Sequence, residues 1–412
     1  MGWDFPGLNL MHYLSFRAIL ATVTSMLVGL LAGKRIIRAL QRKQIGETIR
    51  ELGLEGQMQK KGTPTMGGII IIISLLSGVL LFCDLTNVYV QLLLVSTLWC
   101  GALGFADDYI KVFKHNKEGL SEKAKLLGQL LLGLAIGIAV WLSPDIVVRE
   151  KVTPSKSTEI VLSDQQKTVN SETLIVENVY HEENVVKSTK TTIPFVKNHE
   201  FDYKWLSPFK GAWGWYAKWA IYVLMIVLVI TACSNGTNLT DGLDGLAAGT
   251  TAIVGVVIGI LAWLSGNIVD SNYLHIMYIP GSGEVAIFMS AFVGALIGFL
   301  WYNSFPAQVF MGDTGSLTIG GIIGVSAVLL RKELLLPLLC GIFVIESASV
   351  LIQRGWFKYT KKKYGEGRRV FKMSPIHHHY QKEGIPEAKI TARFWIVGIL
   401  LAVSTLALLK LR

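Results

Sequence analysis

Long runs of apolar residues dominate the hydrophobic pattern of this chain, and mostly short polar connections separate them. A helix needs about 20 apolar residues to cross roughly 30 Å of hydrocarbon. Ten stretches approach this length, at about residues 14–33, 67–83, 88–106, 126–143, 213–233, 245–264, 285–302, 316–331, 334–352 and 394–409. The pattern therefore predicts an all-α polytopic membrane protein with ten transmembrane helices and both termini on one side.

Composition agrees with this class of protein. Hydrophobic residues make up 51% of the chain and charged residues 17%, and the mean hydropathy is +0.48, values far from those of a soluble enzyme. The four cysteines fall in or beside apolar runs, without the spacing of a disulfide or zinc framework. The first apolar run lacks a basic leader and a cleavage site, so we expect it to remain as a helix.

Basic residues concentrate in alternate connections between the predicted helices. Lys and Arg number eight in residues 34–61, five in 111–125 and eleven in 354–393. Cytoplasmic loops carry such an excess, so we expect these segments in the cytoplasm and both termini outside. The net charge of +10 then reflects orientation, and we expect no nucleic-acid partner.

One connection, residues 144–212, is far longer than the others and nearly balanced in charge, with nine basic and ten acidic residues. Residues 157–180 alternate between apolar and polar side chains, which predicts a few strands or a small external subdomain, with disorder as the alternative. The expected organisation is helices 1–4 in residues 1–143, this external insert, and helices 5–10 in residues 213–412. We expect the insert to be dispensable for chemistry, because it faces away from the cytoplasm.

Acidic residues follow the predicted helices on the cytoplasmic face. Asp107 and Asp108 close the third apolar run, and Lys111 follows one turn later. Adjacent carboxylates disfavour each other's ionised form unless a cation lies between them. The pair is either an ordinary interfacial acidic pair or, together with the lysine, part of a phosphate site.

Two glycine-rich segments carry further carboxylates. Asp241 and Asp244 precede the sixth apolar run, in a loop whose backbone N–H groups can approach an anion. The alternative is that Asn238, Thr240 and Asp241 cap the following helix, and we favour a functional role. Asp313 precedes the eighth run in the same pattern, after Asn303. It is either a helix cap or a ligand for Mg²⁺, which takes only one or two protein carboxylates.

Three consecutive histidines, His377, His378 and His379, stand in a basic loop. Adjacent residues point in different directions and no cysteine accompanies them, which disfavours a zinc site. Contact with phosphate, or transfer of a proton, suits these imidazoles better. Carboxylates, lysines and histidines at one lipid boundary together predict chemistry on a phosphorylated substrate that is itself partly a lipid.

Six motifs follow one another along the chain: "KKGTPTMGG", "DDYIK", "GLSEKAKLLGQ", "NLTDGLDGLA", "FMGDTGSL" and "SPIHHHYQKEG". With them the chain resembles the polyprenyl-phosphate N-acetylhexosamine-1-phosphate transferase superfamily. Within it, the segment "PIHHHYQKEG" points to the phospho-N-acetylmuramoyl-pentapeptide transferases. The resemblance covers nearly the whole chain except the insert, which is much longer than the usual loop at that position.

The resemblance implies a reaction and its setting. UDP-N-acetylmuramoyl-pentapeptide and undecaprenyl phosphate give lipid I and UMP, with Mg²⁺ as cofactor, in the membrane step of peptidoglycan synthesis. The expected location is the bacterial inner (cytoplasmic) membrane. The resemblance leaves open whether the protein forms a homodimer, and the sequence identifies no partner for the insert.

The resemblance also implies roles for particular residues. Asp313 matches the metal ligand, Asp107 and Asp108 match the pair that activates the lipid phosphate, and His377 is expected to be catalytic beside the sugar-phosphate. The expected substrate-binding residues are Lys61, Lys111, Lys125, Asn238, Asp241, Gly242, Leu243, Asp244, Asn303, Phe310, Gly312, His378 and His379.

Two other functions stay open from the sequence. A relative that acts on another UDP-amino-sugar is the nearer one. A secondary transporter is the other, because Glu346 lies inside the ninth apolar run and intramembrane acids mark ion pathways. An interhelical hydrogen bond explains Glu346 more simply, and transporter sites lie near the bilayer midplane between repeated halves.

Overall fold

The structure, a computed structural model, describes residues 8–43, 62–114, 116, 118–149, 185–193, 200–274 and 276–409. About three quarters of the described chain is helical. The helices are α1 (Leu14–Lys43), α2 (Gly68–Phe82), α3 (Val88–Phe113), α4 (Glu122–Leu142), α7 (Gly211–Thr240), α8 (Leu246–Gly266), α9 (Ile268–Tyr273), α10 (Gly283–Asn303), α11 (Gly312–Leu329), α12 (Leu336–Leu339), α13 (Gly341–Tyr364), α14 (Ile376–Lys382) and α15 (Glu387–Leu408), with the 3-10 helices η1 (Leu8–His12), η5 (Tyr203–Leu206) and η6 (Glu333–Leu335).

Each predicted apolar run falls on a helix, but two of these helices differ from a simple membrane span. In the described part of the chain, eight helices are long and apolar enough to cross a membrane. The ninth run is broken, because residues Glu333–Leu339 and Gly341–Tyr364 are bent by 77° relative to each other. The second run forms α2, which has only 15 residues. The chain is therefore a polytopic helical membrane protein.

Helix α2 is short because the chain before it pairs with another segment. The N–H of Gly67 donates to the carbonyl of Phe310 (2.8 Å), and that of Gly68 donates to Met311 (2.9 Å). A Cβ at Gly68 would collide with the backbone of Gly315, so only glycine allows the two segments to approach so closely. This contact holds the start of α2 against the loop that enters α11.

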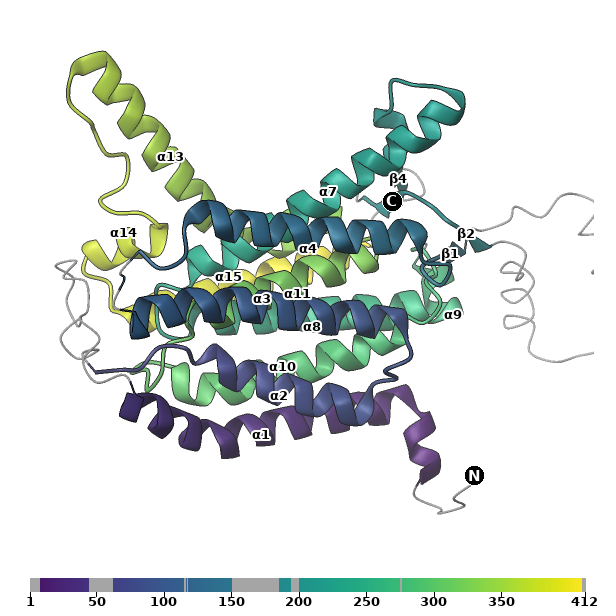
Figure 1. Cartoon of the computed structure of the whole chain (residues 1–412), viewed down its shortest axis with the longest axis horizontal. Helices are drawn as coiled ribbons and strands as arrows, with labels where there is room; N and C mark the ends of the chain where they lie inside the picture. The colour runs from purple at the N-terminus through teal and green to yellow at the C-terminus, as the bar shows by residue number, and fades with distance from the viewer. Residues whose placement is uncertain are drawn as a thin grey trace, which may run out of the picture.

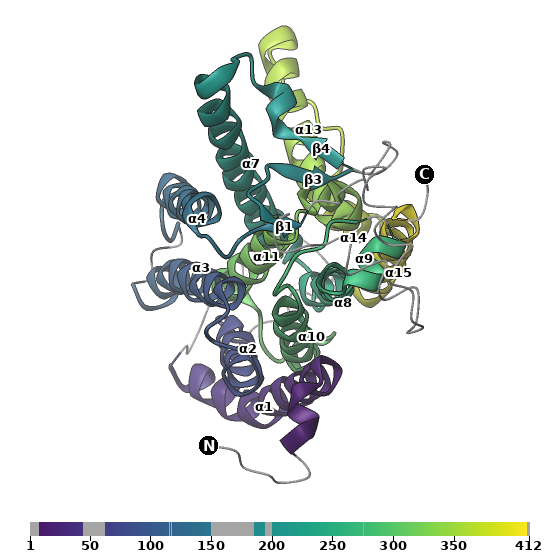
Figure 2. The same cartoon turned by 90° about the vertical axis from the view of Figure 1, so that its right-hand side faces the viewer.

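Helix α11 lies at the centre of the bundle. Figure 1 shows most of the long helices running side by side, with α7 and α13 inclined to them, and Figure 2, turned by 90°, shows the bundle arranged around α11. Helix α11 packs against α2, α3, α7 and α8, and all its residues from Thr314 to Leu329 are buried. Whatever lies at the first turn of α11 is therefore held by several helices at once.

Short strands frame the long insert. Strand β1 (Val148–Arg149) pairs antiparallel with β2 (Val185–Val186), and β3 (Lys190–Thr192) pairs antiparallel with β4 (Glu200–Asp202). The stretch 157–180, where the sequence predicts strands, lies outside the described residues. The β1–β2 pairing places Arg149 opposite Val185, so the two described residues that flank 150–184 lie side by side.

The second hairpin covers three buried charged residues, Arg331, Lys332 and Glu333, in the connection that follows α11. Each is only 2% exposed. Thr192 donates its N–H to the carbonyl of Arg331 (2.9 Å), and Lys332 donates through Nζ to Thr192 Oγ1 (2.7 Å). Tyr203 donates its hydroxyl to Glu333 Oε1 (3.2 Å). Burial lowers the pKa of Lys332 to about 8, and the negative charges of Glu333 and of Glu200 on β4 oppose this shift.

These contacts limit how much of the insert can be dispensable. Replacing residues 150–184 by a short Gly/Ser linker should leave the thermal unfolding midpoint in detergent unchanged, because β1–β2 pairing already brings the linker ends together. Extending the deletion through Thr192 should lower the midpoint, because a buried group that loses its partner costs about 1–3 kcal/mol. Equal midpoints for the two deletions would show that the hairpin does not support the turn after α11.

Candidate active site at the first turn of α11

Asp313 stands in the first turn of α11 and gathers polar partners from three other helices. Lys111, on α3, lies with its Nζ 3.2 Å from Asp313 Oδ2, and Lys125, on α4, lies 2.6 Å from the same oxygen. Asn238, near the end of α7, donates its amide to Asp313 Oδ1 (2.9 Å) and to Ser316 (2.9 Å). Four segments that are distant in sequence thus meet at one carboxylate.

The carboxylate that caps α11 is Asp108, whereas the sequence leaves Asp313 as either a helix cap or a metal ligand. Asp108 Oδ1 accepts the N–H of Asp313 (3.1 Å), and its Oδ2 accepts the N–H (2.8 Å) and the hydroxyl (2.6 Å) of Thr314. A carboxylate satisfies free N–H groups at a helix N-terminus and interacts favourably with the helix dipole. Gly312 lets the two approach: its φ is +71°, and a Cβ there would press on Asp108. Capping by Asp108 leaves the carboxylate of Asp313 free for other partners.

Asp107 is fully buried and lies among cations. Its Oδ2 lies 2.5 Å from Lys111 Nζ and its Oδ1 lies 2.9 Å from Lys125 Nζ, while Oδ1 also accepts the N–H of Leu120 (2.7 Å). The two lysines therefore bridge Asp107 and Asp313. An ordinary acidic pair at the membrane interface, which the sequence leaves open, would not need two lysines fixed between two carboxylates. The arrangement therefore favours a phosphate site.

A tight loop between α7 and α8 forms the opposite wall of the site. Asp244 donates its N–H to Glu387 on α15 (2.7 Å) and accepts the N–H of Ala307 through Oδ2 (3.0 Å). Asn303 accepts the N–H of Gly245 (3.1 Å) and donates to the carbonyl of Val309 (2.9 Å). The loop is thus fixed to α10, to the loop that follows it, and to α15.

The sequence leaves open that Asn238, Thr240 and Asp241 cap the next helix, and the structure does not bear out this alternative for Asn238 and Asp241. Asn238 belongs to the last turn of α7, which ends at Thr240, and Asp241 is the C-cap position of α7. Helix α8 begins at Leu246 after Gly245, with no side-chain cap. Asn238 and Asp241 are therefore not used to start α8 and remain at the site.

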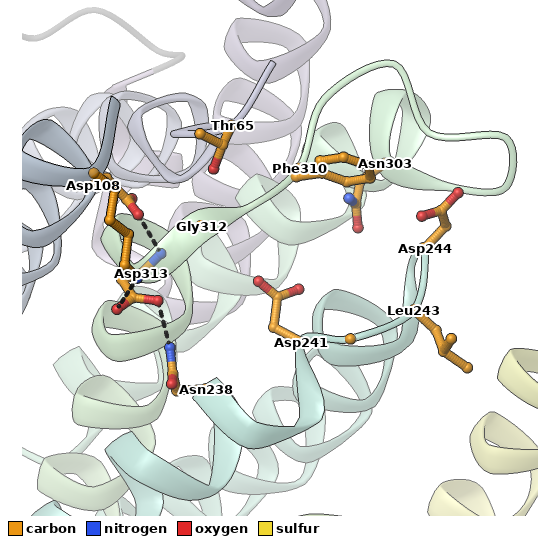
Figure 3. A pocket seen from close by; sticks show the side chains of 12 residues that line it. Thr65, Asp108, Asn238, Asp241, Leu243, Asp244, Asn303, Phe310, Gly312 and Asp313 are labelled. Carbon is orange, nitrogen blue, oxygen red and sulfur yellow. Dashed lines mark hydrogen bonds and ion pairs between the residues drawn. The ribbon is translucent and has the colours of Figure 1, made fainter. Parts of the chain in front are cut away.

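These walls enclose a cavity of about 380 Å³. Figure 3 shows Asp241 projecting its carboxylate between the Asp313 side and the Asn303 side, while Leu243 points away from it. The residues lining the cavity are Thr65, Asp108, Lys111, Asn238, Asp241, Gly242, Leu243, Asp244, Asn303, Phe310, Gly312 and Asp313. Asp107 and Lys125 lie just behind them, in contact with Lys111 and Asp313. Lys61 lies outside the described residues.

The three histidines have different surroundings, although the ring centroids of His377 and His378 lie 4.1 Å apart. His377 is fully buried, its Nδ1 lies 3.0 Å from Glu346 Oε2 on α13, and a Cβ at Gly242 would overlap its Nε2. His378 Nδ1 lies 2.7 Å from Gln381 Oε1. His379 accepts the N–H of Lys372 (3.1 Å) and lies toward the loop between α13 and α14. None of the three lines the cavity, and the contact of Glu346 with a second helix confirms the simpler explanation of this acid.

Sequence reasoning missed three residues that shape the site. Thr65 lines the cavity, although it stands within "KKGTPTMGG", the motif that supplied only Lys61 as a candidate. Glu387 fixes the loop at Asp244, and Thr391, one turn later on α15, donates to the carbonyl of Asp244 (3.2 Å). The Pro386–Glu387 pair, with proline before an acidic first turn, is a helix-start signal, but nothing in the pattern tells which loop the carboxylate contacts.

The donor set suits a hard divalent cation. One carboxylate oxygen from each of Asp107, Asp108 and Asp313 lies within 4.8 Å of the others. Oxygen ligands of this kind are those that Mg²⁺ and Ca²⁺ prefer, and Mg²⁺ needs only one or two of them beside phosphate and water. The described residues offer no cysteine or histidine in this cluster, which fits a hard cation better than zinc.

Comparisons with known proteins agree with the site. A model of glycosyl transferase family 4 matches residues 185–331, and a phospho-N-acetylmuramoyl-pentapeptide-transferase signature matches residues 60–72. The proteins of that name from Parabacteroides distasonis, Flavobacterium psychrophilum and Porphyromonas gingivalis are 54%, 55% and 53% identical to this chain. The matches cover 99%, 100% and 99% of this chain and 97% of each relative.

Such coverage includes the long insert, so these relatives carry a segment of comparable length there. More than half of the residues are identical over nearly the full length of both chains, and the short signature lies in the segment that carries Thr65 and leads into α2. The chain therefore belongs to the phospho-N-acetylmuramoyl-pentapeptide-transferase family.

Proposed function

We propose that this protein transfers phospho-N-acetylmuramoyl-pentapeptide from its UDP conjugate to undecaprenyl phosphate, producing lipid I and UMP in the membrane step of peptidoglycan synthesis. The observation that carries the proposal is the joining of Asp313, Asp107, Lys111 and Lys125 at one end of a helical membrane bundle, in a chain of this family. The site lies beside hydrocarbon because one reactant is a lipid.

The reaction places negative charge on the attacking and leaving oxygens of a diphosphate. Catalysis then depends mainly on groups that are already positioned to stabilise that charge. Lys111 and Lys125 are held in place by Asp107 and Asp313, so each can face a phosphate oxygen without reorganising. We assign Asp107 and Asp108 to the side of the lipid phosphate.

The second wall of the cavity is assigned to the UDP part of the substrate. The lining there includes the polar residues Asp241, Asp244 and Asn303 and the aromatic residue Phe310. We assign Asn238, Asp241, Leu243, Asp244 and Asn303 to nucleotide and diphosphate contacts, together with Gly242, Phe310 and Gly312. Direct contact of His377, His378 or His379 with the sugar-phosphate stays a prediction, since none of them lines the cavity.

We assign Mg²⁺ to the carboxylate cluster, with Asp313 as its principal protein ligand. The bound ion would neutralise charge on the diphosphate and help to orient it. Asp313 suits this role because its carboxylate projects into the cavity and is not used as a helix cap.

A test of the reaction follows UMP release by the purified protein in detergent. We expect UMP only when UDP-N-acetylmuramoyl-pentapeptide, undecaprenyl phosphate and Mg²⁺ are all present. EDTA should stop release, and added Mg²⁺ should restore it. Steady UMP release without the lipid, or an undiminished rate after chelation, would refute the proposed reaction or its metal.

We further propose ten membrane crossings, with α2 and the bent pair α12–α13 counted as crossings, both termini outside and the site in the cytoplasm of a bacterial inner membrane. The basic connections support this orientation: the 354–393 segment carries eleven Lys and Arg. The proposed organisation is then residues 1–143 with the first four crossings, the external insert 144–212, and residues 213–412 with the last six crossings. We assign no partner to the insert.

Sidedness can be measured with introduced cysteines. All four native cysteines are buried, so they should react slowly. In intact cells, an impermeant maleimide should label Lys204→Cys, on the insert side, and should label Glu366→Cys, between α13 and α14, only after permeabilisation. Labelling of both positions in intact cells would contradict the orientation.

A further inference from the structure

The buried contact between Glu346 and His377 has no role in the proposed reaction so far. Both side chains are completely buried, and they come from α13 and α14. Their distance, 3.0 Å between Nδ1 and Oε2, is that of a hydrogen bond. Because a carboxylate oxygen accepts, the ring donates through Nδ1, and this fixes the direction in which Nε2 points.

That direction leads to the cavity loop. A Cβ added at Gly242 would overlap Nε2 and approach the neighbouring ring atoms of His377. Nε2 itself is buried and has no hydrogen-bond partner among the described residues. The ring therefore forms the wall behind Gly242, whose other side lines the cavity. The backbone of Gly242 does not have a positive φ, so its conformation does not require glycine. Glycine is needed there because a side chain would overlap the ring of His377.

The rest of the loop is held independently of His377. Glu387 and Thr391 hold the backbone of Asp244, and Trp395 donates to the carbonyl of Gly245 (3.3 Å). These contacts lie after Gly242. Before it, the N–H of Gly242 donates only within its own turn, to the carbonyl of Thr240 (2.9 Å). Packing against the ring of His377 therefore supports the loop at Gly242 from the side that faces away from the cavity.

We propose that Glu346 is a positioning residue for nucleotide binding: it holds His377 against Gly242 and thereby sets the place of the loop between Asp241 and Asp244. The inference rests on the proposed function, because it assigns the loop to the UDP part of the substrate. Glu346 on α13 then affects how tightly the protein binds the nucleotide, although Glu346 itself does not touch the substrate. A structural pair without such a role would affect only folding.

The test measures UMP binding by calorimetry, which needs no turnover. In Glu346→Ala, the ring loses the only hydrogen bond that it makes within the described residues, and the dissociation constant for UMP should rise about tenfold, the scale of one lost hydrogen bond to a charged group. Glu346→Gln should rescue most of the affinity, because its amide oxygen still accepts from Nδ1. Glu383→Gln, which alters the exposed partner of His379, is the matched control and should bind UMP like the wild type.

A second variant keeps the inference testable if Glu346→Ala does not fold. Gly242→Ala should also weaken UMP binding, because its Cβ displaces the loop from the ring. In the background of His377→Ala, the same change should add no further loss, because the ring is gone. Gly355→Ala, on α13 where a Cβ meets nothing within 4 Å, is the control for the alanine substitution.

Kinetics give an independent readout. Glu346→Ala should raise the KM for UDP-N-acetylmuramoyl-pentapeptide while leaving the KM for undecaprenyl phosphate within about twofold. Wild-type affinity for UMP in folded Glu346→Ala, or additive losses for Gly242→Ala and His377→Ala, would overturn the inference. Failure of the wild-type protein itself to bind UMP would instead overturn the proposed function on which the inference rests.

Discussion

Asp313→Asn is expected to lower turnover roughly a thousandfold or more, the scale of losing a positioned group that stabilises transition-state charge. The carboxylate of Asp313 receives both lysines through Oδ2 and the amide of Asn238 through Oδ1. An uncharged amide has the same shape but cannot balance two ammonium groups or bind Mg²⁺ with comparable strength. The loss should therefore appear in turnover at saturating substrate.

The measurement compares initial rates of UMP release for protein purified in detergent, with thermal unfolding to verify the fold. Asp145→Asn is the matched control, because this exposed aspartate lies just after α4, in the turn that leads to β1, and it should retain wild-type activity. Activity of Asp313→Asn near that of the wild type at ordinary Mg²⁺ would show that Asp313 is not the principal metal ligand.

The second large effect concerns Asp107 and Asp108 and separates two mechanisms. Undecaprenyl phosphate is already largely ionised near neutral pH, so its oxygen needs alignment and charge cancellation more than it needs a strong base. We therefore expect direct attack by the lipid phosphate, and no UMP when lipid is absent. Asp107→Asn and Asp108→Asn should each lose about a hundredfold in rate, yet at least one should keep a measurable rate, because the nucleophilic oxygen belongs to the lipid.

The two variants should differ in stability. Asp108 caps α11 through three hydrogen bonds, so Asp108→Asn should lower the free energy of unfolding by about 1 kcal/mol, the usual cost of a damaged cap. Asp107→Asn should affect mainly the positions of Lys111 and Lys125. Rapid-quench detection of one UMP per enzyme without lipid, abolished in either variant, would identify that aspartate as a covalent nucleophile and exclude direct attack.

The positions of the helices could be predicted from the sequence because apolar length alone decides whether a segment can cross a membrane. The break at residues 339–341 could not, since "LLLPLLCGIFVIE" reads as one apolar run and the 77° bend depends on how α12 and α13 pack on other helices. The short α2 also depends on tertiary pairing, because Gly67 and Gly68 bond to Phe310 and Met311 across the bundle.

The candidate site, like the fold, could be predicted from the sequence only in part. Carboxylates and lysines at helix ends on one predicted face pointed to a shared surface, and Asp108, Lys111, Asn238 and Asp313 do line one cavity. The sequence could not tell which carboxylate caps a helix, because Asp108 reaches α11 from another helix. Nor could it place His377 behind Gly242, since adjacent histidines have the same chemistry and only packing separates them.

The most direct test offers the protein two nucleotide sugars at once. Purified protein is incubated with undecaprenyl phosphate, Mg²⁺ and equal amounts of UDP-N-acetylmuramoyl-pentapeptide and UDP-N-acetylglucosamine, and the lipid products are identified by mass spectrometry. We predict undecaprenyl-diphospho-N-acetylmuramoyl-pentapeptide as the lipid product, with one UMP released for each molecule formed. Undecaprenyl-diphospho-N-acetylglucosamine as the main product, or no lipid product from a folded and metal-loaded protein, would contradict the proposed function.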